Sequence, residues 1–391
     1  MTAPAKTKVA VITPSPTPYR VPFFRRLAQC EEIAVKVFFL TAKSPTRPWQ
    51  ADLDGFEWEV LRGVSVPMGR RWRYRISPSI ISRLRRGRFD CIVVGGYNHF
   101  TTEAAIVYAI LTDTPWCLMS ESHSLKARGA FKVALKRVLL GPILRRMGAA
   151  MVTGTLAKEY LQTFGVPAPA IFTVSNIPDV AWFRDAAEAA RPRRDELKGR
   201  LGVAGKRVIL FAGRLIEEKG IRVLIDAFAA ARASRPDLAL VLVGNGSRSR
   251  EFQALVAGKN LADVHFLGFR SQSGLPEIYA AADVFVLPSL SEPWGVVVCE
   301  AMACGLPVIV SDRVGASADL VEEGQNGFVV EAGDAAALAA RIIDVFADDV
   351  RRALMAARSR DIISRWDYRM CVGGFLSAVS TAVAGKVRPD A

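Results

Sequence analysis

The sequence has few of the residues that bind metals or form disulfide frameworks. Its 391 residues include three histidines and six cysteines, and no two cysteines form a Cys-x-x-Cys pair. No cysteine shows metal-ligand spacing with a histidine, so neither a zinc site nor a disulfide scaffold is indicated. Scattered cysteines of this kind are typical of reduced thiols in the cytosol. We therefore predict a cytoplasmic protein that holds no metal.

Long apolar runs are also missing. The longest late run, residues 371–385, spans about fifteen residues, whereas about twenty are needed to cross a bilayer. The early run from Val9 to Ile12 is far shorter than the apolar region of a signal peptide. We expect neither a membrane span nor a signal peptide, and we interpret residues 371–385 as a terminal helix packed on protein.

Acidic residues are the minority charge, and the shortage is confined to one half of the chain. The formal net charge is +14, from 52 Lys and Arg against 38 Asp and Glu. Residues 1–190 hold 26 basic and 14 acidic side chains, whereas residues 191–391 hold 26 and 24. The asymmetry indicates an anionic surface or substrate for the first half, such as acidic lipid or nucleic acid.

Short apolar runs alternate with helical patterns along both halves of the chain. Strands are expected at 8–13, 35–40, 91–95, 116–120 and 149–153, and again at 208–212, 239–243, 264–267, 284–287 and 308–310. This alternation predicts an α/β protein with parallel sheets covered by helices. The length allows two or three domains. Two tandem Rossmann-like units would leave a cleft at the carboxyl ends of their strands.

The stretch from Ser289 to Asp312 is predicted to be a loop, a short helix and a strand. The helix opens near Gly295 and ends at Gly305, since a glycine just past the last turn is a common helix stop. The first N–H groups of a helix, here at Gly295 and Val296, have no partner within it and carry partial positive charge. The opening of this helix therefore suits a phosphate group.

Two carboxylates lie in the same stretch, Glu292 on the loop and Glu300 inside the helix, and both can face one ligand. A carboxylate beside a phosphate would repel it. Glu292 is therefore better suited to accept hydrogen bonds from neutral hydroxyls, and Glu300 likewise from a ribose or sugar hydroxyl. The ligand that combines these groups is a nucleotide sugar.

Seven residues separate Glu292, in the motif Glu292-Pro-Trp-Gly295, from Glu300. This spacing resembles the Glu-x7-Glu signature of the retaining glycosyltransferases of family 4. The resemblance runs through most of residues 208–345 and more loosely upstream. It implies the GT-B fold, in which two facing Rossmann-like domains are followed by a C-terminal helix that crosses back to the first. It also implies a hexosyltransferase-type enzyme that takes a nucleoside diphosphate sugar and needs no cofactor.

The resemblance also implies where the domains divide. The segment from Asn176 to Asp179 is similar to the one with which the family closes its first domain. The alternating charges of residues 184–206 indicate a linker. The expected parts are therefore an N-terminal acceptor-binding domain at 1–183, this linker at 184–206, a C-terminal nucleotide-sugar-binding domain at 207–360 and a returning helix at 361–391.

A basic turn follows the first strand of the second half. Arg214 offers a planar fork and Lys219 a mobile point charge, so together they can neutralise a leaving diphosphate. Their Gly-Arg-Leu and Lys-Gly context matches the family. The alternative is a solvated loop whose charges lie beside Glu217 and Glu218.

Two further loops are candidates for the nucleotide. Val243 to Ser247 resembles the family's Val-Gly-x-Gly and places Gly244 and Gly246 beside the nucleotide, although a tight turn alone would explain both glycines. By resemblance, the backbone near Phe269 and Arg270 meets the base.

Candidates in the first half are less sharply defined. His123 follows a predicted strand, and the resemblance implies that it faces the donor sugar, where a neutral imidazole can bond a hydroxyl. The alternative is a structural loop histidine. Glu121 and His99 are further candidates for the cleft, and Arg20, in a Pro-Tyr-Arg turn that replaces the family's usual Gly-Gly, is a candidate for acceptor contact.

Two acidic motifs do not point to the donor. Asp52-Leu-Asp54 is formally the metal-binding Asp-x-Asp of the other main glycosyltransferase fold, but it lies in an irregular polar stretch, so it supports no metal site. Asp319 stands where many relatives carry Glu, and we interpret it as ordering a loop.

Two basic clusters lie in the first half, one on a predicted helix at 131–147 that is interrupted at Gly141-Pro142. The helix places Lys132, Lys136 and Arg137 opposite Phe131, Leu135, Val138 and Leu139, and the second cluster comprises Arg70, Arg71, Arg73, Arg75, Arg83, Arg85, Arg86 and Arg88. Such surfaces bind anionic headgroups at about 1 kcal/mol per well-placed cation. The alternative is an apolar side facing the core and a solvated polar side. Together the clusters favour peripheral association with the inner face of a membrane.

The sequence therefore predicts a retaining glycosyltransferase that moves a sugar from a nucleoside diphosphate sugar to a hydroxyl acceptor, such as a lipid-linked or cell-envelope saccharide. Arg214 and Lys219 would hold the diphosphate, Glu300 the ribose and Glu292 the donor sugar, with His123 assisting. The alternatives are a nucleotide-sugar epimerase on the same fold and a basic membrane- or nucleic-acid-binding protein. No nucleic-acid motif supports a nucleic acid partner.

Overall fold

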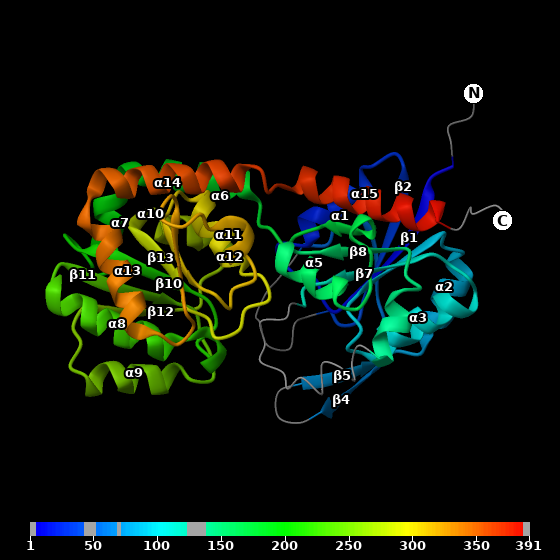
Figure 1. Ribbon diagram of the computed structural model, residues 1–391, viewed down its shortest axis with the longest axis horizontal. Coiled ribbons are helices and arrows are strands. Elements are labelled where there is room, and N and C mark those ends of the chain that lie inside the picture. The colour runs from blue at the N-terminus through cyan, green and yellow to red at the C-terminus, as the bar shows by residue number, and fades with distance from the viewer. Residues whose placement is uncertain (1–4, 43–51, 69–71, 123–137, 386–391) are drawn as a thin grey trace. The chain divides into compact units, whose positions relative to one another are not determined.

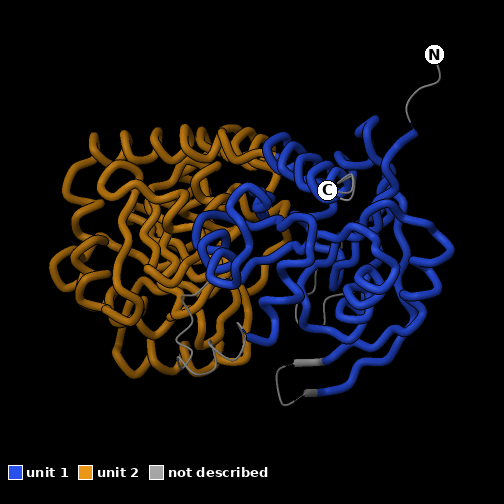
Figure 2. The backbone as a smooth tube through the Cα atoms, turned by 45° about the vertical axis from the view of Figure 1, so that its right-hand side comes forward, with its two compact units in different colours: residues 1–176, 368–391 blue, residues 177–367 orange. Residues whose placement is uncertain are grey.

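The computed structural model describes residues 5–42, 52–68, 72–122 and 138–385. The chain divides into two units (Figure 2). The first comprises Met1–Asn176 together with Tyr368–Ala391, and the second comprises Ile177–Asp367. The chain therefore passes between the units twice, after Asn176 and after Asp367.

A seven-stranded parallel sheet forms the centre of the first unit, in the order β3-β2-β1-β6-β7-β8-β9 (Figure 1). The strands are β1 (Thr7–Thr13), β2 (Ile33–Phe39), β3 (Glu57–Val60), β6 (Cys91–Gly95), β7 (Trp116–Ser120), β8 (Ala149–Val152) and β9 (Ile171–Thr173). The helices include α1 (Val21–Ala28), α2 (Ser79–Gly87), α3 (Phe100–Leu111), α5 (Thr155–Gln162) and α15 (Tyr368–Ala384). The five strands predicted for this half are confirmed. The strand order reverses between β1 and β6, where ligands bind in such sheets.

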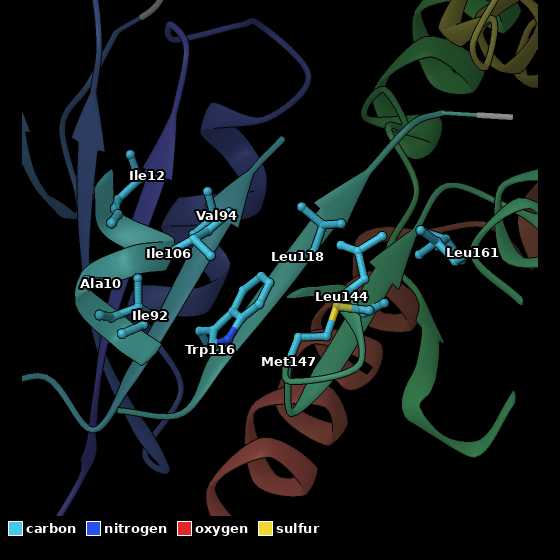
Figure 3. Close-up of a cluster of buried hydrophobic side chains, with 14 of the residues drawn as sticks. Ala10, Ile12, Ile92, Val94, Ile106, Trp116, Leu118, Leu144, Met147 and Leu161 are labelled. Carbon is cyan, nitrogen blue, oxygen red and sulfur yellow. The ribbon is translucent and has the colours of Figure 1, made fainter. Parts of the chain in front are cut away.

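The core of the first unit lies between this sheet and its helices. Figure 3 shows Ile12, Val94 and Leu118 side by side on neighbouring strands, with Trp116 close to Met147. The strands are apolar along most of their length because helices cover both faces of the sheet. The terminal helix α15 packs on β7, β8 and β9, so the expectation of a helix packed on protein is confirmed.

Four strands in the first half were not predicted, β9 among them. Residues 41–75 show no regular pattern in sequence, yet they include β3 and an antiparallel hairpin of β4 (Val64–Met68) and β5 (Trp72–Ile76). Of the predicted basic helix, residues 131–137 lie outside the described residues. Residues 138–144 are helical without a break, so the interruption expected at Gly141-Pro142 is wrong. Proline removes only one N–H donor, and Arg145 N still donates to Gly141 O (3.0 Å).

A six-stranded parallel sheet forms the centre of the second unit, in the order β12-β11-β10-β13-β14-β15. The strands are β10 (Arg207–Ala212), β11 (Leu238–Val243), β12 (Val264–Gly268), β13 (Val284–Leu287), β14 (Val308–Ser311) and β15 (Gly327–Val330). The helices include α8 (Ile221–Ser234), α9 (Ser249–Gly258), α10 (Leu275–Ala281), α11 (Val296–Ala303), α12 (Ser317–Leu320), α13 (Ala335–Ala347) and α14 (Asp349–Ser364). The predicted order of loop, helix and strand after β13 is confirmed.

The segment expected to be a linker, residues 184–206, is instead largely helical and part of the second unit. It contains most of α6 (Val180–Ala190) and all of α7 (Arg194–Arg200), which pack on α10. Asp283, at the start of β13, accepts hydrogen bonds from Arg194 (2.7 Å) and Lys198 (3.0 Å). Two of the charges that indicated a linker, those of Arg194 and Lys198, are thus partners of a buried carboxylate. The returning segment begins at Tyr368, whereas 361 was expected.

Candidate functional site

Three loops meet at the carboxyl edge of the second unit's sheet, and hydrogen bonds between backbones join them. Leu290 N, after β13, donates to Glu218 O, after β10 (2.9 Å). Gly315 N, after β14, donates to Glu292 O (3.0 Å). The loops approach so closely that a Cβ at Gly315 would lie 1.9 Å from Pro293 O. This contact fixes the loop that leads into α11.

Helix α11 opens at this edge, with Gly295 as its N-terminal cap. Gly295 has φ 107°, a left-handed conformation that favours glycine. Val296 is the first helical residue, so the unpaired N–H groups at the opening of α11 lie next to the loop that carries Glu292. The predicted phosphate-binding helix end therefore exists, and its role in binding stays a prediction.

Lys219 and Glu292, predicted separately as diphosphate and sugar ligands, form an ion pair between Lys219 Nζ and Glu292 Oε2. Their side chains are only 16% and 14% exposed. A lysine and a carboxylate from different loops thus meet at the opening of α11. Arg214 lies in the first of these loops, half-buried, five residues before Lys219.

Glu300 points into the unit from α11 and is buried. Tyr279 Oη on α10 donates to Glu300 Oε2 (2.9 Å). Burial raises the pKa of Glu300 to about 7, and the hydrogen bond from Tyr279 opposes that rise. The Glu300 carboxyl group therefore changes its protonation state near neutral pH. Its proposed bond to a ribose hydroxyl stays a prediction.

The structure explains why positions 244 and 246 are glycines, a question that the sequence left open. A Cβ at Gly244 would lie 1.9 Å from Gly213 O, and one at Gly246 would lie 2.1 Å from Leu215 O. Both glycines let the loop after β11 pack on the loop that carries Arg214. They support the position of that loop, and contact with the nucleotide stays a prediction.

Phe269 and Arg270 directly follow the edge strand β12, at the same carboxyl edge of the sheet. Phe269 is exposed although it is a large apolar side chain. By resemblance the backbone near Phe269 and Arg270 meets the base, and that contact stays a prediction.

In the first unit, His123 lies outside the described residues. His99 Nδ1 accepts a hydrogen bond from Arg75 N (3.2 Å) and so joins α3 to β5. Burial lowers the pKa of His99, and Glu103 opposes that shift. The lowered pKa keeps the imidazole neutral at neutral pH. The position of His99 thus has a structural explanation. Glu121 follows β7 and pairs with Arg20.

Asp52 and Asp54 both contact one arginine. Arg25 Nη2 donates to Asp52 Oδ2 (2.6 Å), and Arg25 Nε donates to Asp54 O (2.8 Å). Within the described residues, no group of three or more His, Cys, Asp or Glu side chains could hold a metal ion. Across all the residues that the structure describes, no helix is long and apolar enough to cross a membrane.

Sequence reasoning missed three residues that support the site. Tyr279 belongs to an apolar pattern that does not distinguish it from core. Trp294 occupies the hydrophobic position of the Glu-Pro-hydrophobic-Gly motif, and it is buried with its ring centroid 5.4 Å from that of Trp366. The motif could have indicated Trp294, whereas the partner lies 72 positions later and carried no local signal.

Comparison with known proteins gives matches along both halves of the chain. Residues 193–361 match the family model described as "Glycosyl transferases group 1", and residues 10–176 match the model described as "Glycosyl transferase 4-like domain". The chain is 27% identical over 346 residues to phosphatidyl-myo-inositol mannosyltransferase of Mycobacterium leprae, covering 85% of this chain and 86% of that protein. It is 28% identical over 277 residues to the GDP-mannose-dependent alpha-(1-6)-phosphatidylinositol monomannoside mannosyltransferase of Mycolicibacterium smegmatis, covering 61% and 72%.

Solved structures with the same fold cover almost the whole chain. The structure of Anabaena HepE in complex with UDP gives a TM-score of 0.75 at 20% identity, covering 96% of this chain and all of that one. Sucrose-phosphate synthase of Thermosynechococcus elongatus gives a TM-score of 0.72 at 19% identity, covering 97% and 100%. At these identities the likeness shows the fold alone.

Proposed function

The chain belongs to the family 4 glycosyltransferases, which combine a 4-like domain with a group 1 domain, and from this premise we propose that it transfers a sugar, with retention, from a nucleoside diphosphate sugar to a hydroxyl acceptor. The ion pair between Lys219 and Glu292 beside the opening of α11 carries this proposal. It brings together a cation suited to phosphate and a carboxylate suited to hydroxyls, which are the two halves of such a donor.

Each donor group has a proposed partner at this edge. Arg214, Lys219 and the N–H groups at Gly295 and Val296 neutralise the diphosphate as it leaves. Glu292 accepts hydrogen bonds from the donor sugar and Glu300 from the ribose. Gly244 and Gly246 hold the neighbouring loop, and Phe269 and Arg270 border the base.

The reaction exchanges one bond at the anomeric carbon for another. The bond from that carbon to the diphosphate oxygen breaks, and the acceptor oxygen forms its bond on the same face of the sugar. The acceptor proton passes to the leaving diphosphate. This mechanism needs charge stabilisation of the leaving group rather than a metal or cofactor, and Lys219 with Arg214 supplies that charge. His123 is proposed to assist near the anomeric carbon.

Binding of the donor gives the first test. Thermal-shift and calorimetric titrations with UDP-, GDP- and ADP-sugars should show that one class stabilises the protein by mass action. Mannose donors come first, because the two relatives above are mannosyltransferases by name. No stabilisation by any of these sugars would contradict the proposed function.

Product analysis separates the transferase from an epimerase on the same fold. Transfer predicts a new glycoside that appears only when an acceptor is present, with the donor's anomeric configuration preserved. Inversion at a sugar carbon without any acceptor would favour the epimerase instead.

A specific observation also favours peripheral binding to an anionic membrane, where a lipid-linked or cell-envelope saccharide would be presented. Val138 and Leu139, on the helical segment 138–144, are 71% and 61% exposed, and Arg145 and Arg146 directly after it are exposed as well. These apolar side chains do not face the core, contrary to the plainer interpretation of the sequence. Exposed apolar residues beside cations suit an anionic interface on the cytoplasmic side.

Sedimentation with vesicles tests this second proposal. The protein should bind vesicles containing phosphatidylglycerol more strongly than pure phosphatidylcholine, and the double substitution Val138→Ser and Leu139→Ser should weaken binding. The matched control is Val350→Ser and Leu354→Ser, two exposed apolar residues of α14 in the second unit. Equal binding to both vesicle types would contradict membrane association through this segment.

A further inference from the structure

The Pro-Tyr-Arg turn after β1 places Arg20 at the carboxyl edge of the first unit's sheet. Its guanidinium donates hydrogen bonds to Thr13 Oγ1 (3.1 Å), Glu121 Oε1 (2.6 Å) and Asn176 Oδ1 (3.0 Å). Thr13 ends β1, Glu121 follows β7, and Asn176 follows β9. One side chain thus joins the ends of three strands. Arg20 is 11% exposed, whereas Glu121 is 39% exposed.

The same turn contacts the chain where it leaves and re-enters the first unit. Asn176 is the last residue before the chain passes to the second unit, and Tyr368 is the first after it returns. Tyr368 Oη donates to Tyr19 O (3.1 Å), and the Arg26 guanidinium lies 4.6 Å from the centre of the Tyr368 ring. Arg20 therefore holds Glu121 within a well-supported cluster.

The charges at this edge determine what kind of group it can bind. Three nitrogens of the Arg20 guanidinium already donate to protein acceptors, and the side chain is only 11% exposed. Arg20 is therefore poorly suited to bind an anionic acceptor, which revises its expected role as a direct contact. Glu121 is the more exposed partner, and an ionised carboxylate only accepts hydrogen bonds. It suits hydroxyl donors and repels phosphate.

We propose that Glu121 is an acceptor-binding residue that receives a hydrogen bond from a neutral hydroxyl group, and that Arg20 is the positioning residue that holds it. This inference rests on the proposed glycosyl transfer. It names the acceptor group at this edge as an uncharged polyol or sugar hydroxyl. It also makes the Pro-Tyr-Arg turn a determinant of acceptor specificity.

Steady-state transfer assays on the full chain test the assignment, with matched neutral and phosphorylated acceptors: myo-inositol and D-inositol 3-phosphate, glucose and glucose 6-phosphate, glycerol and glycerol 3-phosphate. Arg20→Met should raise the KM for the neutral acceptors about tenfold, the change that corresponds to one lost charge-assisted hydrogen bond. The donor dissociation constant, measured by calorimetry, should stay unchanged. Arg20→Lys should restore part of the lost acceptor affinity, because it keeps the charge.

Glu121→Gln should lower the preference for neutral over phosphorylated acceptors about tenfold, because the repelling charge is removed. Arg25→Met is the matched control for Arg20→Met, since Arg25 lies on α1 directly after the turn and pairs with Asp52 on the surface. A wild-type preference for the phosphorylated acceptors, turnover of no neutral acceptor, or an unchanged acceptor KM in Arg20→Met would overturn the assignment. Failure to bind any nucleotide sugar would overturn the proposed function instead, so the two failures are distinguishable.

Discussion

The two units share one architecture and differ in where they keep their charge. Both are parallel sheets covered by helices, yet the buried charged side chains among the described residues, Lys198, Asp283 and Glu300, all belong to the second unit. In the first unit, the buried polar side chains of the described residues are uncharged, Thr13 and Asn176 among them. Among the described residues of the first unit, no Lys or Arg side chain is buried. The shared fold therefore does not determine the chemistry, which depends on the side chains at each carboxyl edge.

The Arg20–Glu121 pair at the first edge and the Lys219–Glu292 pair at the second differ in exposure. Lys219 and Glu292 are both largely shielded from solvent, whereas Glu121 is considerably more exposed than Arg20. Electrostatic interactions are stronger where water is excluded. We expect the second unit's pair to act on the charge that develops in the reaction and the first unit's pair to act on acceptor binding.

Glu292→Gln and Lys219→Met should cause the largest losses and so give the sharpest contrast between the edges. We expect kcat/KM to fall on the order of a thousandfold in each, the scale of removing one group that stabilises developing charge. Circular dichroism should show that both variants stay folded. Glu251→Gln, on α9 and paired with Arg222 and Arg248 at the surface, is the control. If Glu292→Gln changed only the acceptor KM, as predicted for Arg20→Met, the contrast would be lost.

Asp283→Ala should destabilise the second unit, because this unit contains buried charged side chains and Asp283 is one of them. It would leave Lys198 buried without its partner, at a cost of about 4 kcal/mol in the free energy of unfolding. Asp349→Ala removes an exposed carboxylate that also pairs with arginines, and it should cost well under 1 kcal/mol. Denaturant titrations of both variants measure the difference. Equal costs would show that burial of the charge does not matter.

The Asp283 carboxylate also makes the free energy of unfolding depend on pH in the acid range. Burial alone would raise the pKa of Asp283, but Arg194, Lys198 and the N–H of Val208 hold it below its usual value of 3.8. A depressed carboxyl pKa contributes stability above pH 4 that is lost as the pH falls through the folded-state pKa. The extra stability of the wild type over Asp283→Ala should therefore shrink below pH 4.

Glu300 should give the second unit a pH dependence of opposite sign. Its pKa is raised from 4.5 to about 7, so the folded protein binds this proton more tightly than the unfolded chain does. The free energy of unfolding should fall as the pH rises from 4.5 to 7, by about 3 kcal/mol at most. Urea titrations across this range should show that Glu300→Gln removes the slope. A slope that survives in Glu300→Gln would place its origin elsewhere.

Among the substitutions at the site, Tyr279→Phe should have the smallest effect, and it tests whether Tyr279 positions Glu300. Loss of one buried hydrogen bond costs about 1 kcal/mol. Because that bond lowers the pKa of Glu300, its loss should move the midpoint of the pH dependence above 7. Donor KM should rise more than kcat falls. An unchanged midpoint would show that Tyr279 serves only to fill the core.

Local patterns predicted the second unit's edge well. Apolar runs gave β13 and β14, and Gly305 gave the end of α11, because these elements depend on neighbours within a few residues. The expectation of a linker at residues 184–206 was wrong for the opposite reason. The charges of α7 looked solvated because their partner, Asp283, lies more than eighty positions away in sequence.

The sequence by itself determined the alternation of strands and helices, the basic excess of the first half, and the family through its Glu-x7-Glu motif. Only the tertiary structure decided the partners: that Lys219 meets Glu292, that Tyr279 holds Glu300, and that Arg20 joins the ends of three strands. The physical reason is range. Secondary structure follows from contacts a few residues apart, whereas burial, pKa shifts and hydrogen bonds between loops arise only when distant segments share one sheet edge.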